Sequence, residues 1–430
     1  MKYRIRKQDE LKPSGVEWLG DIPKDWRIKK LKYFAKIKNG QNQQNVLDDE
    51  GTYPIFGSGG IFGKANNYLC DKASVLLGRK GTIDKPIYID KPFWTVDTMY
   101  YTNIFKIANP KFFFYGCLGI PFKLYQYGSA IPSMTQEDLH NINFAFINLI
   151  EQQKIANFLD EKSKIFDEAI SKKEQLISKL ELAKQSLISE VVTGKLKVVE
   201  QNSKLQTIKR EKDELKPSGV EWLGDIPKDW QVKKLKYFTK LNPNKFNLDE
   251  KIKDDIEVSF VPMENIRRGN INLENSKNIN SVINGYTFFE ENDILIAKVT
   301  PCFENHNCAI AKNLKNEIGF GSTELNVLRC FNKDSIKFVY YYIQTDLFIN
   351  LGVSQMTGTG GLKRVPSSFF ENFKISFPTI TEQQKISKYL DEKLIHFDNT
   401  IEKTKQSITK LKEAKEVLIS QAVTGKIEVL

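Results

Sequence analysis

A duplicated segment constrains this chain more than any other feature. Residues 9–34 recur as residues 213–238 with two substitutions. Two shorter segments also recur, namely EQQKI at 151–155 and 382–386, and VTGK at 192–195 and 423–426. The stretches between these segments do not resemble each other. The chain is therefore two copies of one frame around two different inserts, which suggests a scaffold that presents two independent recognition surfaces.

Composition sets the outer limits of the interpretation. A chain of 430 residues is long enough for two or more domains with full cores. Its net charge of +11 favours polyanionic partners, although general solvation explains such a charge as well. The N-terminus lacks the apolar core of a signal peptide, and no apolar run reaches the roughly 18 residues of a membrane span, which predicts a cytoplasmic protein. Five scattered cysteines argue against a disulfide framework.

Two long helices are predicted, over residues 148–192 and 379–423. The first range contains no proline or glycine, and both carry an apolar stripe at alternating steps of four and three, as in a coiled-coil seam. The seam residues are Phe166, Ile170, Ile177, Leu180 and Leu187 in the first helix and Phe397, Ile401, Ile408, Leu411 and Leu418 in the second. Polar residues at the third and sixth positions of each stripe (Lys173, Lys184, Thr404 and Lys415) help to fix one register between two particular helices.

The helix ends and partners follow from the same segments. Thr381 with Gln384 fits a capping box, Asn148 with Glu151 is a weaker version, and Gly194 and Gly425 mark the C-terminal ends. A helix of about 40 residues is roughly 60 Å long and needs a partner along its length. The other copy is the simplest partner, in an antiparallel, pseudo-twofold pair, and separate homodimeric coiled coils are the alternative.

The inserts have a different character. Short apolar strands joined by glycine-rich turns indicate a mixed α/β or mostly β domain in each. Basic side chains beside strand ends and glycines are the candidates for DNA contact, because glycine permits close backbone approach and arginine can bind guanine with two hydrogen bonds. These candidates are Lys64, Arg79 and Lys80 in the first insert and Arg267, Arg268, Lys298, Lys363 and Arg364 in the second. Each taken alone is also explained as a solvated surface charge.

Other motifs predict no chemistry of the chain's own. Cys302, His306 and Cys308 have no fourth ligand at a useful spacing, so no metal site is predicted. No phosphate-binding loop or catalytic histidine arrangement is present, and neither a catalytic residue nor a cofactor is expected. The two tryptophans of each head (WLGDIPKDW) are interpreted as structural braces, with a surface for a partner protein as the alternative.

The order of the frame segments resembles the DNA specificity subunit of type I restriction-modification systems. The resemblance covers essentially the whole chain, through a W-L-G-x-I-P-x-x-W head and an E-Q-Q-K-I helix that ends in V-T-G-K, each present twice. It implies an α+β architecture in which two globular α/β target recognition domains are separated by two long antiparallel coiled-coil helices. The implied divisions are 1–147 (head and first recognition domain), 148–200 (first helix), 201–212 (linker), 213–378 (second head and recognition domain) and 379–430 (second helix).

The resemblance also implies a function. Each recognition domain would read one half of a bipartite double-stranded DNA site, and the helices would dock methyltransferase subunits, two in number. Cleavage and ATP use would belong to restriction/translocase subunits, so this chain is expected to be non-catalytic. The alternative is a symmetric coiled-coil adaptor that bridges two copies of a protein partner without binding DNA. A self-contained nuclease or methyltransferase is disfavoured by the missing motifs.

Overall fold

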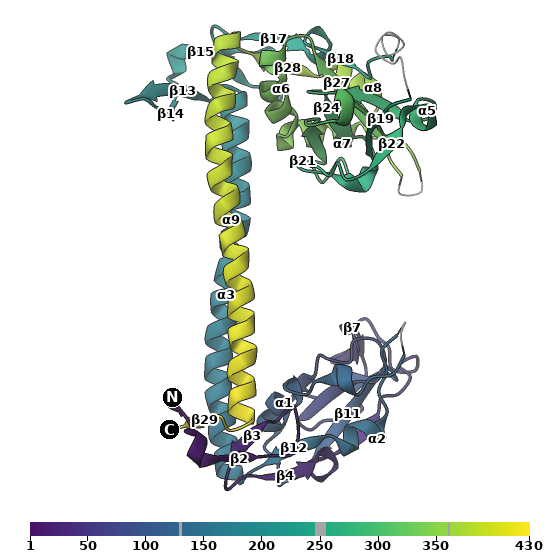
Figure 1. The fold of residues 1–430 in the computed structure, drawn as a ribbon, viewed down its shortest axis with the longest axis vertical. Coiled ribbons are helices and arrows are strands. Elements are labelled where there is room, and N and C mark those ends of the chain that lie inside the picture. Colours follow the sequence, from purple (N-terminus) through teal and green to yellow (C-terminus); the bar gives the residue numbers. More distant parts are fainter. Residues whose placement is uncertain (129–130, 246–254, 360–361) are drawn as a thin grey trace. The chain divides into compact units, whose positions relative to one another are not determined.

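A computed structural model describes residues 1–128, 131–245, 255–359 and 362–430 (Figure 1). The chain divides into two compact units: unit 1 comprises Met1–Gln175 with Thr404–Leu430, and unit 2 comprises Leu176–Lys403. Both units mix helices with sheets, which confirms the predicted α+β class. Within the described ranges, no helix combines the length and the apolar character that crossing a membrane requires.

Unit 1 is built around a four-stranded antiparallel sheet in the order β5-β11-β8-β9. A second sheet, in the order β10-β6-β7, includes one parallel pair, and the remaining strands form two-stranded pairs. The strands are β1 (Tyr3–Ile5), β2 (Leu11–Pro13), β3 (Asp21–Pro23), β4 (Arg27–Lys30), β5 (Ala35–Asn39), β6 (Tyr53–Gly57), β7 (Gly60–Ala65), β8 (Ser74–Gly78), β9 (Ile87–Ile89), β10 (Trp94–Thr95), β11 (Met99–Ile104), β12 (Asn143–Phe146) and β29 (Ile427–Val429). The short helices are α1 (Pro110–Leu118) and α2 (Gln136–Asn141).

Unit 2 contains a sheet of the same order, β18-β27-β24-β25, and a second sheet in the order β22-β19-β26-β23. The strands are β13 (Leu196–Gln201), β14 (Lys204–Lys209), β15 (Leu215–Pro217), β16 (Asp225–Pro227), β17 (Gln231–Lys234), β18 (Thr239–Leu241), β19 (Glu257–Val261), β20 (Ile266–Arg267), β21 (Asn270–Ile271), β22 (Ser276–Asn278), β23 (Thr287–Glu290), β24 (Ile294–Ala297), β25 (Cys308–Ile310), β26 (Ile318–Gly321), β27 (Leu325–Cys330) and β28 (Lys374–Phe377). The short helices are α5 (Ile279–Val282), α6 (Ile336–Ile343), α7 (Asp346–Ser354) and α8 (Ser367–Asn372). The two inserts, which have no sequence similarity, thus each contain a central sheet with the same strand order.

The long helices are α3 (Leu149–Val192) and α9 (Ile380–Val423). The backbone N–H of Glu151 donates to Asn148 Oδ1 at 2.9 Å, which confirms the first cap. The second cap is Thr379, whose Oγ1 accepts from the backbone N–H of Glu382 at 3.4 Å. The prediction of Thr381 as the cap was wrong, because this residue lies inside the first turn of α9.

The helices pack antiparallel in each unit. In unit 1, Lys415 Nζ lies 2.7 Å from Asp167 Oδ1, and Phe158 shares a core with Ile419 further along α9. In unit 2, Lys184 Nζ lies 2.5 Å from Asp398 Oδ1. The two ion pairs join equivalent residues of the repeat and use the lysines at the sixth position of each stripe. The structure places all ten seam residues in buried or half-buried positions.

The repeated heads brace the starts of the long helices. Trp26 is buried and its indole N–H donates to Glu151 Oε1 at 3.2 Å, while the buried Trp230 donates to Glu382 Oε2 at 2.9 Å. Burial raises the pKa of the Glu151 carboxyl, and the Trp26 hydrogen bond opposes that shift. These contacts agree with the interpretation of the tryptophans as braces.

The two helix-end glycines meet the same heads. Gly425 has a φ of +73°, and a Cβ at this position would lie 2.4 Å from the ring of Pro23. Gly194 has a φ of +82°, and a Cβ there would lie 2.5 Å from the ring of Pro227. Both the left-handed backbone and the close approach require glycine, which explains why both copies of VTGK have glycine at this position.

Residues 201–212, expected to be a linker, instead contribute strand β14, which pairs with β13 in a hairpin. In unit 1 the equivalent pair is β1 with β29, formed by the two ends of the chain. A lysine-rich polar segment can form such an edge hairpin because half of its side chains face solvent.

Candidate nucleic-acid interface

In unit 1, Arg79 and Lys80 directly follow β8, at one end of the central sheet. Their backbone N–H groups both donate to the carbonyl of Thr98, at 2.9 and 3.2 Å, and Arg79 Nη1 reaches the carbonyl of Asp97 at 3.3 Å. Arg79 is half-buried and Lys80 is exposed. A returning segment crosses this site, because Gly81 N–H donates to the carbonyl of Pro132 at 2.9 Å.

Unit 2 repeats this backbone arrangement with different side chains. Lys298 follows β24, and its N–H donates to the carbonyl of Glu324 at 3.0 Å. The returning segment brings Lys363, whose carbonyl accepts from Thr300 N–H at 3.0 Å, and Arg364, which forms a backbone bridge with Val299. The structure therefore gathers Lys298, Lys363 and Arg364 at the sheet end that corresponds to Arg79 and Lys80. We call these two places the loop edges of the units.

Arg364 is held in place by a carboxylate. Its Nε and Nη2 donate to the two oxygens of Glu324 at 2.8 and 2.7 Å, and the guanidinium lowers the pKa of the Glu324 carboxyl. Both side chains remain partly exposed. The Glu324 carboxylate thus occupies the pair of donors that arginine can also direct at a guanine edge.

Three predicted residues belong to other elements than those that form the loop edges. Lys64 is exposed on β7, which belongs to the second sheet of unit 1. Arg267 ends β20 and Arg268 lies in the turn to β21, where Gly269 N–H donates to the carbonyl of Cys308 at 2.8 Å and Arg268 Nε lies 3.4 Å from Gln344 Oε1. No hydrogen bond or ion pair in the described chain joins any of the three to another predicted DNA residue.

A cavity of about 450 Å³ adjoins the loop edge of unit 2 and was not predicted from the sequence. Lys298 lines it together with Lys245, Tyr286, Thr323 and Asn244. Tyr286 keeps 40% of its surface exposed, so an aromatic ring, two ammonium groups and two short polar side chains face one opening. The turn that follows β18 supplies Asn244 and Lys245, and its glycine-free, Asn- and Pro-rich sequence was the available signal.

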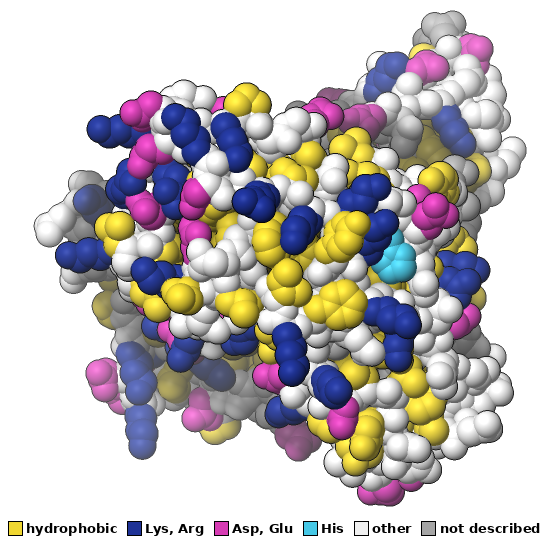
Figure 2. Space-filling model, turned by 90° about the horizontal axis from the view of Figure 1, so that it is seen from below, with side chains coloured by type: hydrophobic (Ala, Val, Ile, Leu, Met, Phe, Trp, Pro, Cys, Tyr) yellow, Lys and Arg dark blue, Asp and Glu magenta, His cyan; other side chains and the backbone are white. Residues whose placement is uncertain are grey.

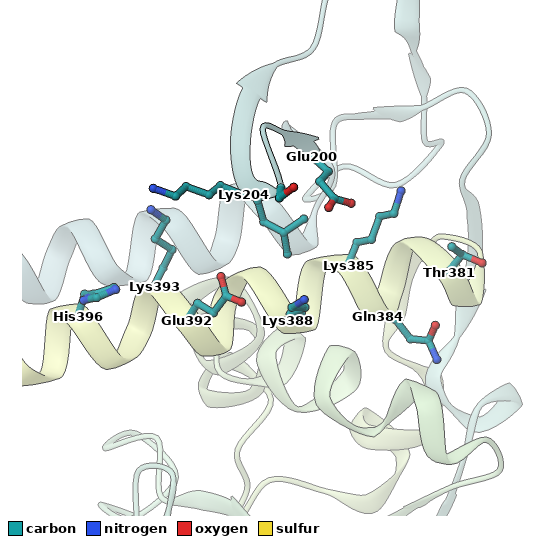
Figure 3. Close-up of a pocket in the computed structure, with 11 residues that line it drawn as sticks. Glu200, Lys204, Thr381, Gln384, Lys385, Lys388, Glu392, Lys393 and His396 are labelled. Carbon is teal, nitrogen blue, oxygen red and sulfur yellow. The ribbon is translucent and has the colours of Figure 1, made fainter.

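A second cavity, of about 610 Å³, lies in unit 2 between the β13–β14 hairpin and α9 (Figure 3). Figure 3 shows Lys204 extending along α9 toward Lys393, with Lys385 and Lys388 projecting from the same helix. Unit 1 differs at the corresponding place, because the ammonium group of Met1 binds Glu161 on α3 at 2.8 Å.

The residues considered for zinc have other partners. His306 Nδ1 lies 3.2 Å from the carbonyl of Gln344 and Nε2 lies 3.4 Å from Asp346 Oδ1. Cys308 is buried, and burial raises the pKa of its thiol to about 12. Among the described residues, no cluster of histidine, cysteine and acidic side chains is arranged to hold a metal ion.

The fold and the two loop edges define a class of protein with duplicated α/β domains on a pair of long helices. The family model for the type I restriction modification DNA specificity domain matches residues 23–182 and 227–413. The chain belongs to this family, which confirms the resemblance drawn from the sequence and favours DNA recognition over the adaptor alternative.

Individual relatives agree with the family match. The chain is 37% identical over 203 residues to the type I restriction enzyme EcoEI specificity subunit of Escherichia coli, an alignment that covers 46% of this chain and 33% of that protein. It is 24% identical over 427 residues to the MjaVIII specificity subunit of Methanocaldococcus jannaschii, covering 95% of this chain and 94% of the relative. The chain thus spans about a third of the length of the E. coli relative.

One solved structure shares the fold over almost the whole chain. It comes from work on complex assembly and conformational transition of the type I restriction-modification system, and it matches with a TM-score of 0.65 at 13% identity, covering 94% of this chain and 99% of that chain.

Proposed function

We propose that the chain is the non-catalytic specificity subunit of a type I restriction-modification complex and reads a bipartite double-stranded DNA site. Each unit would read one half-site through its loop edge. One observation carries the proposal: two units with the same central sheet place basic side chains at the same sheet end, on segments of different sequence. Recognition of two different half-sites requires a shared scaffold that carries different DNA-contacting residues.

The proposed readers are not equivalent in the two units. Arg79 and Lys80 would serve the first half-site, and Lys298, Lys363 and Arg364 the second. Arg364 is the best candidate for direct base contact, because Glu324 already holds two donors of its guanidinium group, Nε and Nη2, in a bidentate arrangement. Lys298, beside the cavity with Tyr286, is better suited to a phosphate, since an ammonium group is a point charge.

The proposed partners are two methyltransferase subunits, with separate restriction/translocase subunits for cleavage. The frame supports two like partners because both heads and both helix starts are repeated, down to the Trp26–Glu151 and Trp230–Glu382 hydrogen bonds. Isolated chain is expected to show neither methylation nor cleavage.

The test is to map methylated adenines by long-read sequencing in a methylation-free host that expresses the chain with its methyltransferase subunit. A bipartite motif should appear only when the chain is present, and exchanging one insert (27–147 or 231–378) should change only one half of it. A soluble, active complex without any new motif would refute the proposal.

The long helices are proposed to set the spacing between the half-sites. A heptad inserted between Ile170 and Ile177, with another between Ile401 and Ile408, preserves the seam because the stripe repeats every seven residues. The spacer in the methylated motif should lengthen while both half-site sequences stay the same. Altered half-sites in this double insertion would contradict the proposed role.

A further inference from the structure

Each unit carries a basic and aromatic surface at the end of its central sheet opposite to the loop edge. In unit 1, Tyr33 precedes β5 and Phe105 follows β11, and the N–H of Phe105 donates to the carbonyl of Phe34 at 2.8 Å. The loop edge begins beyond Gly78, which pairs with Met99 at the other end of β11. The two ends are therefore separated by the length of β11, roughly 17 Å.

Unit 2 presents the same surface. Tyr237 precedes β18, Phe331 follows β27, and the N–H of Phe331 donates to the carbonyl of Phe238 at 2.9 Å. We name these surfaces the outer patches. They consist of Lys30, Lys32, Tyr33, Lys36 and Phe105 in unit 1, and of Lys234, Lys236, Tyr237, Lys240 and Phe331 in unit 2.

The aromatic residues of the outer patches are strongly exposed. Tyr33 and Phe105 keep 55% and 41% of their surface accessible, and Tyr237 and Phe331 keep 63% and 67%. Among the described residues, none of the six patch lysines forms an ion pair with a carboxylate. Figure 2, which views the molecule from below, shows lysine and arginine side chains interleaved with hydrophobic ones and with acidic ones among them. Lys32 Nζ lies 5.6 Å from the centre of the Tyr33 ring and Lys236 Nζ lies 5.7 Å from that of Tyr237, so each patch presents a ring and a cation together on an exposed surface.

Duplication of the head alone does not explain this repetition. Phe105 and Phe331 belong to the inserts, whose sequences do not resemble each other. In addition, Lys30 donates to Asn141 Oδ1 at 2.9 Å and Lys234 to Asn372 Oδ1 at 3.0 Å, although the flanking residues of these asparagines differ. The head supplies three of the five residues of each patch, and the repetition of exposed phenylalanine and lysine extends beyond the duplicated segment.

We propose that the outer patches are docking surfaces for two copies of one protein partner that presents an acidic surface with an apolar recess. Identical patches fit identical partners. Exposed tyrosine and phenylalanine are typical anchors of protein interfaces, whereas phosphate contacts require cations and hydrogen-bond donors but no phenylalanine. The position opposite to the loop edge also leaves the recognition loops free. This inference rests on the proposed function, which places DNA at the loop edges.

The test uses the full-length chain in complex with its methyltransferase subunit, and native mass spectrometry measures the stoichiometry. One variant combines Lys32→Glu, Tyr33→Ala and Phe105→Ser, a second combines Lys236→Glu, Tyr237→Ala and Phe331→Ser, and a third carries all six changes. Each single-patch variant should retain one methyltransferase copy and bind the other about thirtyfold or more weaker, and the third should lose both. The control variant, Lys72→Glu with Tyr68→Ala, alters an exposed lysine and an exposed tyrosine outside the patch and should keep two copies.

DNA affinity of each variant, measured against salt concentration, separates the possible failures. Two retained copies in the six-residue variant would overturn the inference. If that variant instead shows lower DNA affinity and a shallower salt dependence, the outer patches are phosphate contacts, and the inference is again overturned while the proposed function stands. A wild-type chain that captures no methyltransferase subunit would overturn both.

Discussion

In unit 2 the strand pair beside the long helices is one continuous hairpin, β13 to β14, whereas in unit 1 the equivalent pair is made by the two chain ends. The registers are the same. Ile5 pairs with Ile427 in unit 1, and the repeat aligns these residues with Lys209 and Leu196, which pair in unit 2. A covalent turn is therefore unnecessary for this pairing.

The side chains around the two pairs explain why unit 1 closes without a turn. Arg6 lies 3.5 Å from Glu151, and the equivalent Arg210 lies 2.7 Å from Glu382. Each of these carboxylates also accepts the tryptophan N–H of its head. The frame thus fixes the strand pair through contacts to the start of a long helix, and the hairpin turn in unit 2 adds chain connectivity rather than geometry.

The strongest test of this equivalence removes the tryptophan of each head. Trp26→Ala and Trp230→Ala should each lower the free energy of unfolding of their own unit by about 3–5 kcal/mol, because a fully buried ring is lost and a carboxylate keeps only its arginine partner. Hydrogen exchange resolved by unit, measured at increasing denaturant, reports each loss separately.

Trp222→Ala serves as the control for these variants, because 40% of the Trp222 surface is exposed, and its cost should be clearly smaller. A much larger loss for Trp26→Ala than for Trp230→Ala would show that the covalent hairpin does stabilise unit 2 in a way that the chain ends cannot.

A second test asks whether the two loop edges act independently. Arg79→Ala should reduce discrimination at the first half-site and Arg364→Ala at the second, each by about 1–3 kcal/mol. Binding of the complex to targets with one half-site scrambled measures this. Lys85→Ala, at an exposed lysine, is the control. Equal effects of either variant on both half-sites would show that the domains do not read separately.

A third test uses acidity to distinguish the units. Burial, and then the nearby Arg268, lower the pKa of His306, and Asp346 opposes them. The fold therefore favours the neutral ring. At a pH above the ordinary histidine pKa of about 6.5, the ring is neutral in the folded and in the unfolded chain, and it does not change the stability of unit 2. As the pH drops through that value, the unfolded chain binds a proton that the folded chain does not, so the stability of unit 2 falls.

The variant His306→Asn should remove this part of the pH dependence from unit 2, and asparagine tolerates the positive φ of 56° at this position. Unit 1 has no histidine between β8 and β9 and should not share the effect. Unit-resolved hydrogen exchange between pH 7.5 and 5.5 measures it. An unchanged pH profile in the variant would assign the acid sensitivity to other groups.

The frame was predictable because its signals are local. Periodicity gave α3 and α9 nearly to the residue, and the head tryptophans pointed to braces. The common sheet of the inserts was not predictable, since short strands of different sequence pair over long separations that no local pattern records. The pairing of Arg364 with Glu324 and the cavity beside Tyr286 depend on that sheet, which is why the sequence identified the basic residues but not their surroundings.

The last prediction concerns a circular permutation, which moves the chain ends from the β1–β29 pair of unit 1 to the β13–β14 hairpin of unit 2. It should have the smallest effect. The chain is opened between Asn202 and Ser203, at the turn of the β13–β14 hairpin, and its original ends are joined by a short glycine-serine linker. These ends are near each other, because Leu430 N–H donates to the carbonyl of Lys2 at 3.0 Å. Only the exposed ion pair between the Met1 ammonium group and Glu161 is lost, and such a pair contributes little.

The permuted chain should fold with a Tm within about 3 °C of the original and direct the same methylation motif, since strand register and buried contacts are kept. Thermal unfolding and methylation mapping check both points. A chain opened instead between Gly224 and Asp225, inside the second head, should fail to fold unit 2, because this cut separates Leu223 from the core that it shares with Trp230. If the chain opened between Asn202 and Ser203 also failed to fold, the covalent β13–β14 hairpin would be required. The two strand pairs would then share a register but differ in their contribution to folding.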